Sequence, residues 1–193
     1  MNMPFDALGD LSDEALLALY ASGDRAAAAA LSSRLTPLAY RLAARMLGDL
    51  AEAEDVAQEA LLRLWKIAPD WRAGEAKIST WLYRVTSNLC LDRLRKRPNI
   101  ALDTVAEPLD EGPSVEANLM VKSRTDALNN ALLALPDRQR QAVILRHLED
   151  CANPQIAEAM DLSVEAVESL IARGKRRLSE ILRLQKAELG FEE

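Results

Sequence analysis

The sequence has few of the side chains on which metal sites and covalent catalysis depend. It contains one histidine, His147, and two cysteines, Cys90 and Cys151, which lie far apart and lack the spacing of metal ligands. It also lacks glycine-rich phosphate loops and pairs of a nucleophile with a base, and its carboxylates fall beside basic residues at the spacings of exposed helix faces. We therefore expect a protein that is not an enzyme and uses no metal or cofactor.

Secretory and membrane-spanning signals are missing as well. Residues 1–6 lack the basic start and apolar run of a signal peptide, and no apolar stretch approaches the roughly 18 to 20 residues that span a bilayer. Glycine is scarce at 7 residues and aromatic residues make up 4%, whereas alanine and leucine are abundant, which favours helices over strands. We expect a cytoplasmic, all-α protein without membrane insertion.

The net charge of -6 is unevenly distributed along the chain. Residues 1–97 carry 13 basic and 13 acidic side chains, residues 98–121 carry none and five, and residues 122–193 carry 11 and 12. Basic residues cluster late in each flanking part, at Arg93, Arg95, Lys96 and Arg97 and again at Arg173, Lys175, Arg176 and Arg177. Local clusters decide whether a surface attracts phosphate, so the acidic total does not exclude nucleic acid.

Apolar residues three and four apart predict four helices before residue 98, at about 13–21, 25–47, 50–68 and 79–97. Ser12 and Asp24 are expected to cap the first two, Pro37 to kink the second, and Gly48 to end it. Residues 98–113 contain three prolines and several acids, which predicts a linker. More helices follow from about residue 114, including one at 136–148 and two short ones separated by residues 161–163. The prediction is two small helical domains, 1–97 and 122–193, joined by an acidic flexible linker within 98–121.

Residues 153–177 have the pattern of a helix-turn-helix. Asn153 is expected to cap its first helix, Asp161 to occupy the turn, Leu162 to fill it, and Ser163 to cap the second helix. The second helix of such a motif normally enters the DNA major groove. Candidate base-reading and phosphate-reading residues are Glu165, Glu168, Ser169, Ala172 and Arg173, with Lys175, Arg176 and Arg177 near backbone phosphates. The alternative is a helical hairpin that only packs in a core.

A second group of functional candidates lies on the predicted helix 79–97. Tyr83, Arg84, Ser87 and Asn88 lie one turn apart on this helix, which ends in the first basic cluster. Aromatic and cationic surfaces suit single-stranded nucleic acid, whose exposed bases stack and form hydrogen bonds. For the nearby Trp65 and Trp81, core packing is the more economical interpretation.

Together these segments resemble one family. The residues that carry the resemblance are the run from Asp49 to Trp65, then Thr80 to Val85 with Asn88, Leu91, Asp92, Leu94 and Arg95, then Leu135 to Arg140, and finally the helix-turn-helix. In this order, divided by an acidic linker, they resemble an extracytoplasmic-function (ECF) sigma factor of bacterial RNA polymerase over about residues 10–185. The resemblance implies that 1–97 correspond to sigma region 2 and 122–193 to region 4.

The resemblance also implies a role for each segment. Asp55, Gln58, Glu59 and Trp65 would dock on the clamp helices of the largest polymerase subunit, and the second-largest subunit would also be contacted. The promoter -10 element would be melted and bound by a set of eight residues, Arg72, Lys77, Ser79, Tyr83, Arg84, Ser87, Asn88 and Arg95. Among these, the loop from Arg72 to Ser79, with Tyr83, Arg84 and Asn88, would capture a flipped-out base. The recognition helix would read the -35 element. An anti-sigma factor that blocks both domains is a further implied partner.

The recognition helix departs from the family pattern. Relatives often have Gly-Thr-Val-Lys-Ser-Arg at its start, where this chain has the residues from Glu165 to Leu170, so two acids replace a small and a basic residue. An alternative to the sigma factor is an autonomous helix-turn-helix regulator with a helical sensor domain. That alternative accounts for 153–177 but not for the segments from Asp55 to Trp65 and from Tyr83 to Arg97.

Overall fold

The computed structural model describes residues 8–72, 74, 76–97 and 115–184, with the backbone alone over 115–123. Over these residues it is all-helical and contains no strand, as the composition predicts. The elements are α1 (Asp13–Ala21), α2 (Arg25–Leu47), α3 (Leu50–Ile67), the 3-10 turn η2 (Ala68–Asp70), α4 (Ile78–Lys96), α5 (Val115–Leu133), α6 (Asp137–His147), α7 (Asn153–Met160) and α8 (Val164–Leu184). The predicted linker at 98–113 lies outside the described residues. None of the described helices combines the length and the hydropathy needed to cross a bilayer.

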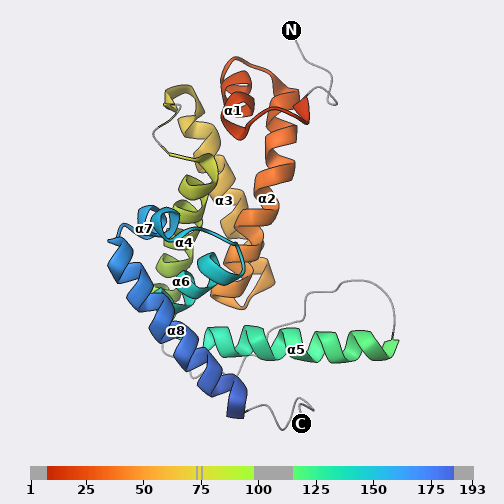
Figure 1. Ribbon diagram of the computed structural model, residues 1–193. Coiled ribbons are helices and arrows are strands. Elements are labelled where there is room, and N and C mark those ends of the chain that lie inside the picture. Colours follow the sequence, from red (N-terminus) through yellow and green to blue (C-terminus); the bar gives the residue numbers. More distant parts are fainter. Residues whose placement is uncertain (1–7, 73, 75, 98–114, 185–193) are drawn as a thin grey trace.

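Helix α2 is the centre of the first half of the molecule. It packs against α1, α3 and α4 (Figure 1) and buries Leu31, Leu35, Leu42 and Met46 completely. The predicted helix starts are confirmed, because Ser12 accepts a hydrogen bond from the Ala15 N–H and Asp24 accepts from the Ala26 N–H. The helix continues through Pro37 and ends at Gly48, whose φ of 68° is left-handed.

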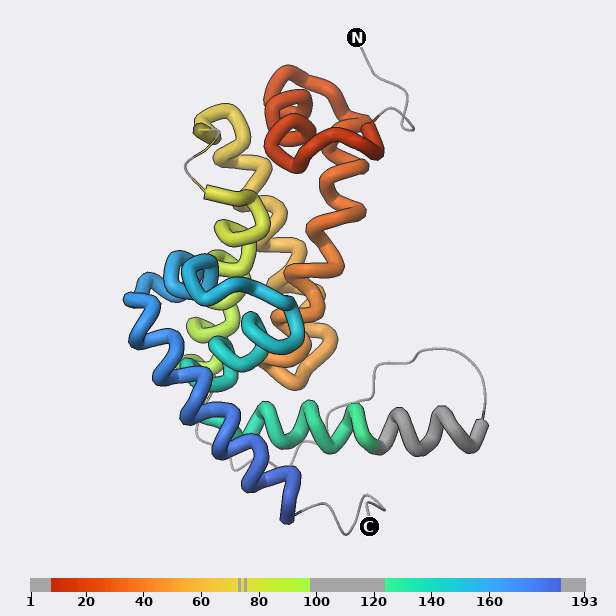
Figure 2. The backbone as a smooth tube through the Cα atoms, viewed as in Figure 1, coloured from red at the N-terminus to blue at the C-terminus, as the bar shows by residue number. Residues whose placement is uncertain are grey.

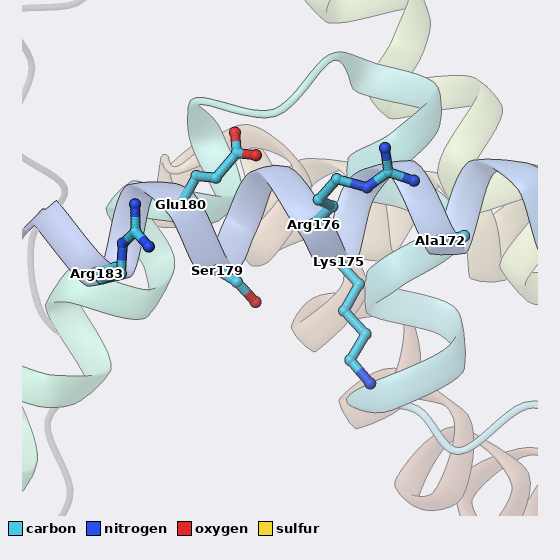
Figure 3. A pocket seen from close by; sticks show the side chains of 6 residues that line it. All are labelled: Ala172, Lys175, Arg176, Ser179, Glu180 and Arg183. Atoms are coloured by element: carbon cyan, nitrogen blue, oxygen red, sulfur yellow. The ribbon is translucent and has the colours of Figure 1, made fainter.

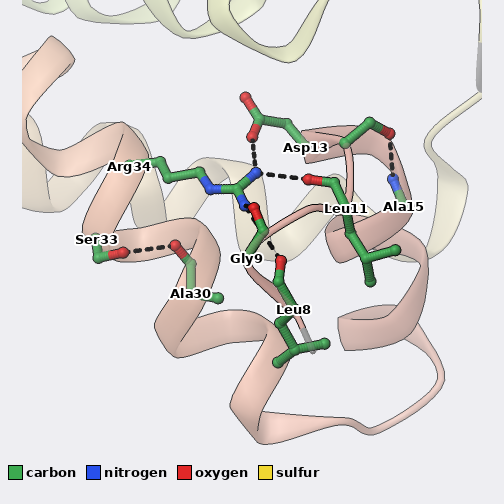
Figure 4. Close-up of polar contacts among 9 residues, drawn as sticks. Leu8, Gly9, Leu11, Asp13, Ala15, Ala30, Ser33 and Arg34 are labelled. Carbon is green, nitrogen blue, oxygen red and sulfur yellow. Dashed lines mark hydrogen bonds and ion pairs between the residues drawn. The ribbon is translucent and has the colours of Figure 1, made fainter. Parts of the chain in front are cut away.

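The chain before α1 is held by a single arginine of α2. The Arg34 guanidinium donates hydrogen bonds to the carbonyl oxygens of Leu8, Gly9 and Leu11 and forms an ion pair with Asp13 (Figure 4). Leu8 is thereby fixed with its side chain fully buried in the core. The Arg34 guanidinium thus supplies hydrogen-bond donors for the carbonyl oxygens of a turn that lies outside any α-helix.

The second half contains the expected helix-turn-helix in α7 and α8. Asp161 adopts the left-handed conformation at φ 55°, and the Ser163 hydroxyl accepts from the Ala166 N–H at 3.2 Å, as predicted. The prediction for Asn153 is wrong: the N-cap is Ala152, whose N–H is satisfied by the Gln155 side chain at 2.9 Å. Asn153 lies inside the first turn and donates to Glu168 instead.

Two further expectations for this motif are corrected. Leu162 does not fill the turn, because its side chain is exposed, and the turn is closed by the backbone bond from the Leu162 N–H to the Ala157 carbonyl. Helix α8 is not short, since it spans 21 residues. Leu178 and Ile181 continue the apolar spacing beyond the motif and pack against the core, which prolongs the helix.

The two halves pack directly against each other. Figure 2 shows α6 and α7 lying across α2 and α4, and contacts join α4 to α7 and α2 to α5 and α6. Gly48 lies against α5 so closely that a Cβ atom there would be 2.5 Å from Leu133 Cδ1. The sequence predicted two domains but did not indicate this interface.

Helices α6 and α8 cross at a glycine. A Cβ on Gly174 would lie 2.7 Å from Val143 Cγ2 and 3.2 Å from the Gln139 carbonyl oxygen, and that backbone atom has little freedom to move. We expect Gly174→Ala to lower the free energy of unfolding by about 1–3 kcal/mol through overpacking, although alanine is the better helix former.

The matched control for this substitution is Ser179→Ala, at an exposed position of the same helix, which improves helix propensity without a steric conflict. Urea denaturation of both variants measures the difference. A stabilised Gly174→Ala protein would show that α6 and α8 do not pack this closely.

Candidate nucleic-acid interface

One face of α3 presents acidic and apolar groups to solvent. Asp55 is exposed and lies 3.9 Å from the Arg93 guanidinium, Gln58 is also exposed, and Glu59 forms an ion pair with Arg63 one turn later. Trp65 is different, because its ring packs against Tyr20 with 4.7 Å between the ring centroids. The structure thus brings Asp55, Gln58 and Glu59 together at the surface and places Trp65 against the core.

Leu62 lies on the same face of α3 and was missed in the sequence. Its side chain is 59% exposed, which makes it one of the few large apolar residues open to solvent among the described residues. The buried stripe of α3, from Ala53 through Ala60 to Leu64, leaves Leu62 on the outside. Leu62 does not fit the three-and-four spacing of the buried apolar residues of α3, and this departure is the signal by which the sequence could have identified it as exposed.

The predicted -10 residues on α4 divide into an exposed and a buried set. Arg84, Asn88 and Arg95 are exposed on one face of the helix, and Arg95 is paired with Asp92 at 2.6 Å. Tyr83 and Ser87 are buried, and the Tyr83 hydroxyl donates to Glu149 of the second half, whose α7 packs on α4. In the preceding loop, Arg72 and Lys77 are exposed, and Ser79, in the first turn of α4, is half-buried.

The basic cluster at the end of α4 is partly used inside the first half. Arg93 donates to the Glu52 carbonyl oxygen at 3.0 Å, and Arg97 donates to the Leu47 carbonyl oxygen and to the Glu52 carboxylate. These two cations hold the end of α4 against the turn between α2 and α3. Lys96 and Arg95 are left on the solvent side of the cluster.

A carboxylate of the second half is buried against the first half. Glu149, just after α6, is held by Arg45 at 2.6 Å and by Arg41 at 3.2 Å, and it accepts a hydrogen bond from the Tyr83 hydroxyl at 3.3 Å. Burial, followed by the charge of Glu149, raises the pKa of Tyr83, so the phenol remains a donor. Burial and the same carboxylate raise the pKa of the neighbouring Cys151 to about 11.

Sequence reasoning missed this group because its members are distant in the chain. Arg41 and Arg45 lie about a hundred residues before Glu149, and their spacing alone is that of an ordinary solvated helix face. The pattern contains no local signal that a carboxylate will cover them. Only the packing of α6 and α7 on α2 and α4 brings the charges together.

The recognition helix α8 presents its predicted DNA-binding residues to solvent. Exposed side chains include Glu165, Glu168, Ser169, Ala172, Arg173, Lys175, Arg176 and Arg177. Val167 is buried, and Leu170 and Ile171 pack against the core from the opposite side of the helix. The closed packing of the two halves therefore covers part of the α4 face and leaves the α8 face open.

The two acids of α8 have different surroundings. Hydrogen bonds from its own backbone N–H and from the Ser163 hydroxyl lower the pKa of Glu165. Its negatively charged carboxylate therefore lies at the positive N-terminal end of the helix dipole, which favours an anion. Glu168 accepts a hydrogen bond from the Asn153 amide at 3.2 Å while remaining exposed. Glu168 is thus steered by α7 at the start of the recognition helix.

The later turns of α8 carry most of the basic groups. An open depression of about 510 Å³ runs along these turns, and its described lining is Ala172, Lys175, Arg176, Ser179, Glu180 and Arg183. Figure 3 shows Lys175 extending away from the helix, with Arg176 and Arg183 on the same stretch of α8. Cations in such a row suit the spaced charges of a phosphate backbone.

Comparisons with known proteins identify both halves. Residues 31–99 match the model of Sigma-70 region 2, and residues 125–178 match that of Sigma-70, region 4. The chain is 32% identical over 155 residues to the ECF RNA polymerase sigma factor SigW of Bacillus subtilis, a match that covers 75% of this chain and 82% of SigW. It is 32% identical over 181 residues to SigM of Mycobacterium tuberculosis, covering 92% of this chain and 88% of SigM.

Solved structures show the same fold. CnrH, in its complex with the cytosolic domain of CnrY, matches with a TM-score of 0.69 at 24% identity, over 89% of this chain and 97% of CnrH. RpoE of Bartonella quintana, in its complex with the anti-sigma factor NepR, matches with a TM-score of 0.64 at 21% identity, over 79% and 94% of the two chains. With both regions matched in order and relatives aligned over most of their length, this chain belongs to the ECF sigma factors of bacterial RNA polymerase.

Proposed function

We propose that the protein directs core RNA polymerase to a specific set of promoters through three surfaces. The exposed face of α3 binds core polymerase, the α4 face binds and melts the -10 element, and α8 reads the -35 element. Residues 1–97 then act as region 2 and residues 122–193 as region 4. The observation that carries this proposal is the presence of all three surfaces, in this order, in a chain of the sigma family.

The chemistry of α3 supports polymerase binding. Asp55 and Glu59 lie one turn apart on the same face as the exposed Leu62, so the helix offers negative charge beside an apolar contact. A protein interface usually has an apolar centre with few charged residues and a rim of polar and charged residues. Trp65 contributes through packing that holds α3 against α1.

The α4 surface supports binding of unpaired DNA. Arg84 and Asn88 provide a cation and an amide on one exposed face, with Ser79 in the first turn of α4 and Arg72 and Lys77 in the adjoining loop. An amide both donates to and accepts from a base edge, so Asn88 is suited to a base that has left the stack. Tyr83 and Ser87 join this surface once the second half has moved away.

An inhibitory protein partner and a cytoplasmic location complete the proposal. RpoE of Bartonella quintana was solved with an anti-sigma factor, and CnrH with a cytosolic domain of CnrY. We infer a partner of the same class for this chain, which shares their fold. A factor that acts on RNA polymerase works where the polymerase is, in the cytoplasm.

Run-off transcription with purified core polymerase tests the proposal directly. We expect discrete transcripts from a library of genomic promoter fragments when the full chain is added, and none with core polymerase alone. An autonomous regulator would instead bind a duplex operator tightly without polymerase. Transcripts that do not depend on the added chain would contradict the proposal.

Polymerase binding provides a more specific prediction. We expect Asp55→Lys combined with Glu59→Lys to weaken core association by about tenfold or more, because attraction to a basic partner becomes repulsion. Helix content should not change, since both side chains are at the surface. The matched control is Glu158→Lys with Glu180→Lys, which makes the same net-charge change on the exposed surface of the second half. Fluorescence anisotropy of labelled protein titrated with core polymerase gives both affinities, and equal values would remove α3 from the interface.

The recognition helix provides another prediction. A carboxylate at the start of such a helix can accept from cytosine N4, so we expect Glu168→Ala to change the preferred base at one -35 position by about 1–3 kcal/mol. Arg173→Ala should weaken all promoters similarly and reduce the salt dependence. The measurement is a binding series over single-base variants at two salt concentrations. If Glu168→Ala strengthens every sequence equally, its charge only repels phosphate.

A further inference from the structure

We propose that Arg41 and Arg45 of α2, together with Tyr83 of α4, form a binding site for a phosphate of the promoter DNA backbone, which Glu149 occupies while the two halves are packed together. The inference rests on the proposed function and adds a site to the -10 surface. It also makes Glu149 an internal competitor of DNA.

The geometry around Glu149 is that of an anion site. Each carboxylate oxygen faces a guanidinium, with Oε1 2.6 Å from Arg45 and Oε2 3.2 Å from Arg41, and Oε2 also accepts from the Tyr83 hydroxyl. The Glu149 side chain is 1% exposed, whereas Arg41 and Arg45 remain partly open to solvent. The cations therefore belong to the surface of the first half, and the anion is inserted from the second.

A backbone phosphate has the chemistry to replace this carboxylate. Both groups present oxygens that share a negative charge, and guanidinium groups bind either one through paired, charge-assisted hydrogen bonds. Arg41 and Arg45 lie four residues apart on one helix face, so they remain next to each other without Glu149. Tyr83 supplies a neutral donor at the same point.

The site adjoins the surface proposed for the -10 element. Tyr83 precedes Arg84 on α4, and Asn88 follows little more than one turn later. A strand that leaves a base at Asn88 must continue its backbone along the neighbouring surface. Arg41 and Arg45 extend the positive charge of α4 onto α2 in the direction of Tyr83.

The protein with its halves packed together is too small to reach both promoter elements at once, so this packing cannot persist on a promoter. Elements centred at -10 and -35 lie about 25 base pairs apart, or about 85 Å at 3.4 Å per base pair. A compact chain of this length has a radius of gyration of about 16 Å and is roughly 40 Å across. The halves must therefore separate to reach both elements, and this separation withdraws Glu149 from the two arginines.

Binding to a labelled 20-nucleotide oligothymidylate, measured by anisotropy with the full chain, tests the site. We expect Glu149→Gln to tighten binding about fivefold or more at low salt, because the arginines lose their internal anion. Adding Arg41→Ala and Arg45→Ala to this variant should abolish the gain. The slope of log affinity against log salt should then fall by about 0.7 for each phosphate that the protein no longer neutralises.

Matched controls separate the site from general charge effects. Asp150→Asn removes the same charge one residue later, at an exposed position whose left-handed φ of 51° asparagine tolerates, and should change affinity less than twofold. Arg25→Ala with Arg63→Ala, added to Glu149→Gln, removes two exposed cations from the same half and should preserve the gain. Circular dichroism verifies that each variant is folded, and small-angle X-ray scattering reports whether Glu149→Gln enlarges the radius of gyration.

Three results would overturn the proposal. Unchanged DNA affinity in a Glu149→Gln protein that has expanded would show that Glu149 joins the halves but that the arginines bind another partner, such as an acidic protein. A gain that survives removal of both arginines would place the phosphate elsewhere, and an equal gain from Asp150→Asn would reduce the effect to net charge. The assay contains no polymerase, so its failure is distinct from a failure of run-off transcription.

Discussion

Arg140 carries the buried positive charge around which the second half is organised and by which it is joined to the first. Its guanidinium donates to the carbonyl oxygens of Leu132, Leu133 and Leu135, where α5 ends, and to that of Met46 near the end of α2 at 2.5 Å. Burial lowers the pKa of this arginine, and the neighbouring Asp137 acts in the opposite direction. A buried cation must have all its donors satisfied, so the end of α2 becomes part of the second half's structure.

This constraint determines which functional surfaces are accessible. With α2 and α5 joined at Arg140 and at Gly48, α6 and α7 lie over α2 and α4, where Glu149 meets Arg41 and Arg45. Part of the α4 face is then covered, while α3 and α8 keep their exposed residues. A protein packed in this way exposes the α3 face while part of the α4 face is still covered. When the halves separate, water solvates the charged groups at both contacts, Arg140 at one and Glu149 with Arg41 and Arg45 at the other. The packed and separated states therefore differ in free energy by much less than the summed interaction energies.

Local features were predicted well because neighbouring residues determine them. Ser12, Asp24 and Ser163 cap helices by bonds to N–H groups two or three residues away, and Gly48 and Asp161 adopt left-handed conformations that few other residues tolerate. The prediction for Asn153 was wrong because Gln155 competed for the cap and Glu168, on another helix, attracted the asparagine side chain. The expected short α8 was wrong for a related reason, since Leu178 and Ile181 pack against the core beyond the motif. The expected filling of the turn by Leu162 was wrong because a backbone bond to Ala157 closes the turn and the leucine side chain stays exposed.

The sequence by itself determined the helices, their order, the helix-turn-helix and the membership of the sigma family, because each depends on the spacing of residues along a short segment. Tertiary structure alone decided that Trp65 packs inward while Leu62 remains outside, that Arg93 and Arg97 hold the turn between α2 and α3, and that Gly174 admits the crossing of α6. It also decided that Glu149 meets Arg41, Arg45 and Tyr83. These interactions join residues from about 30 to more than 100 positions apart, or depend on which side of a helix a neighbour covers, and neither property is expressed in a local pattern.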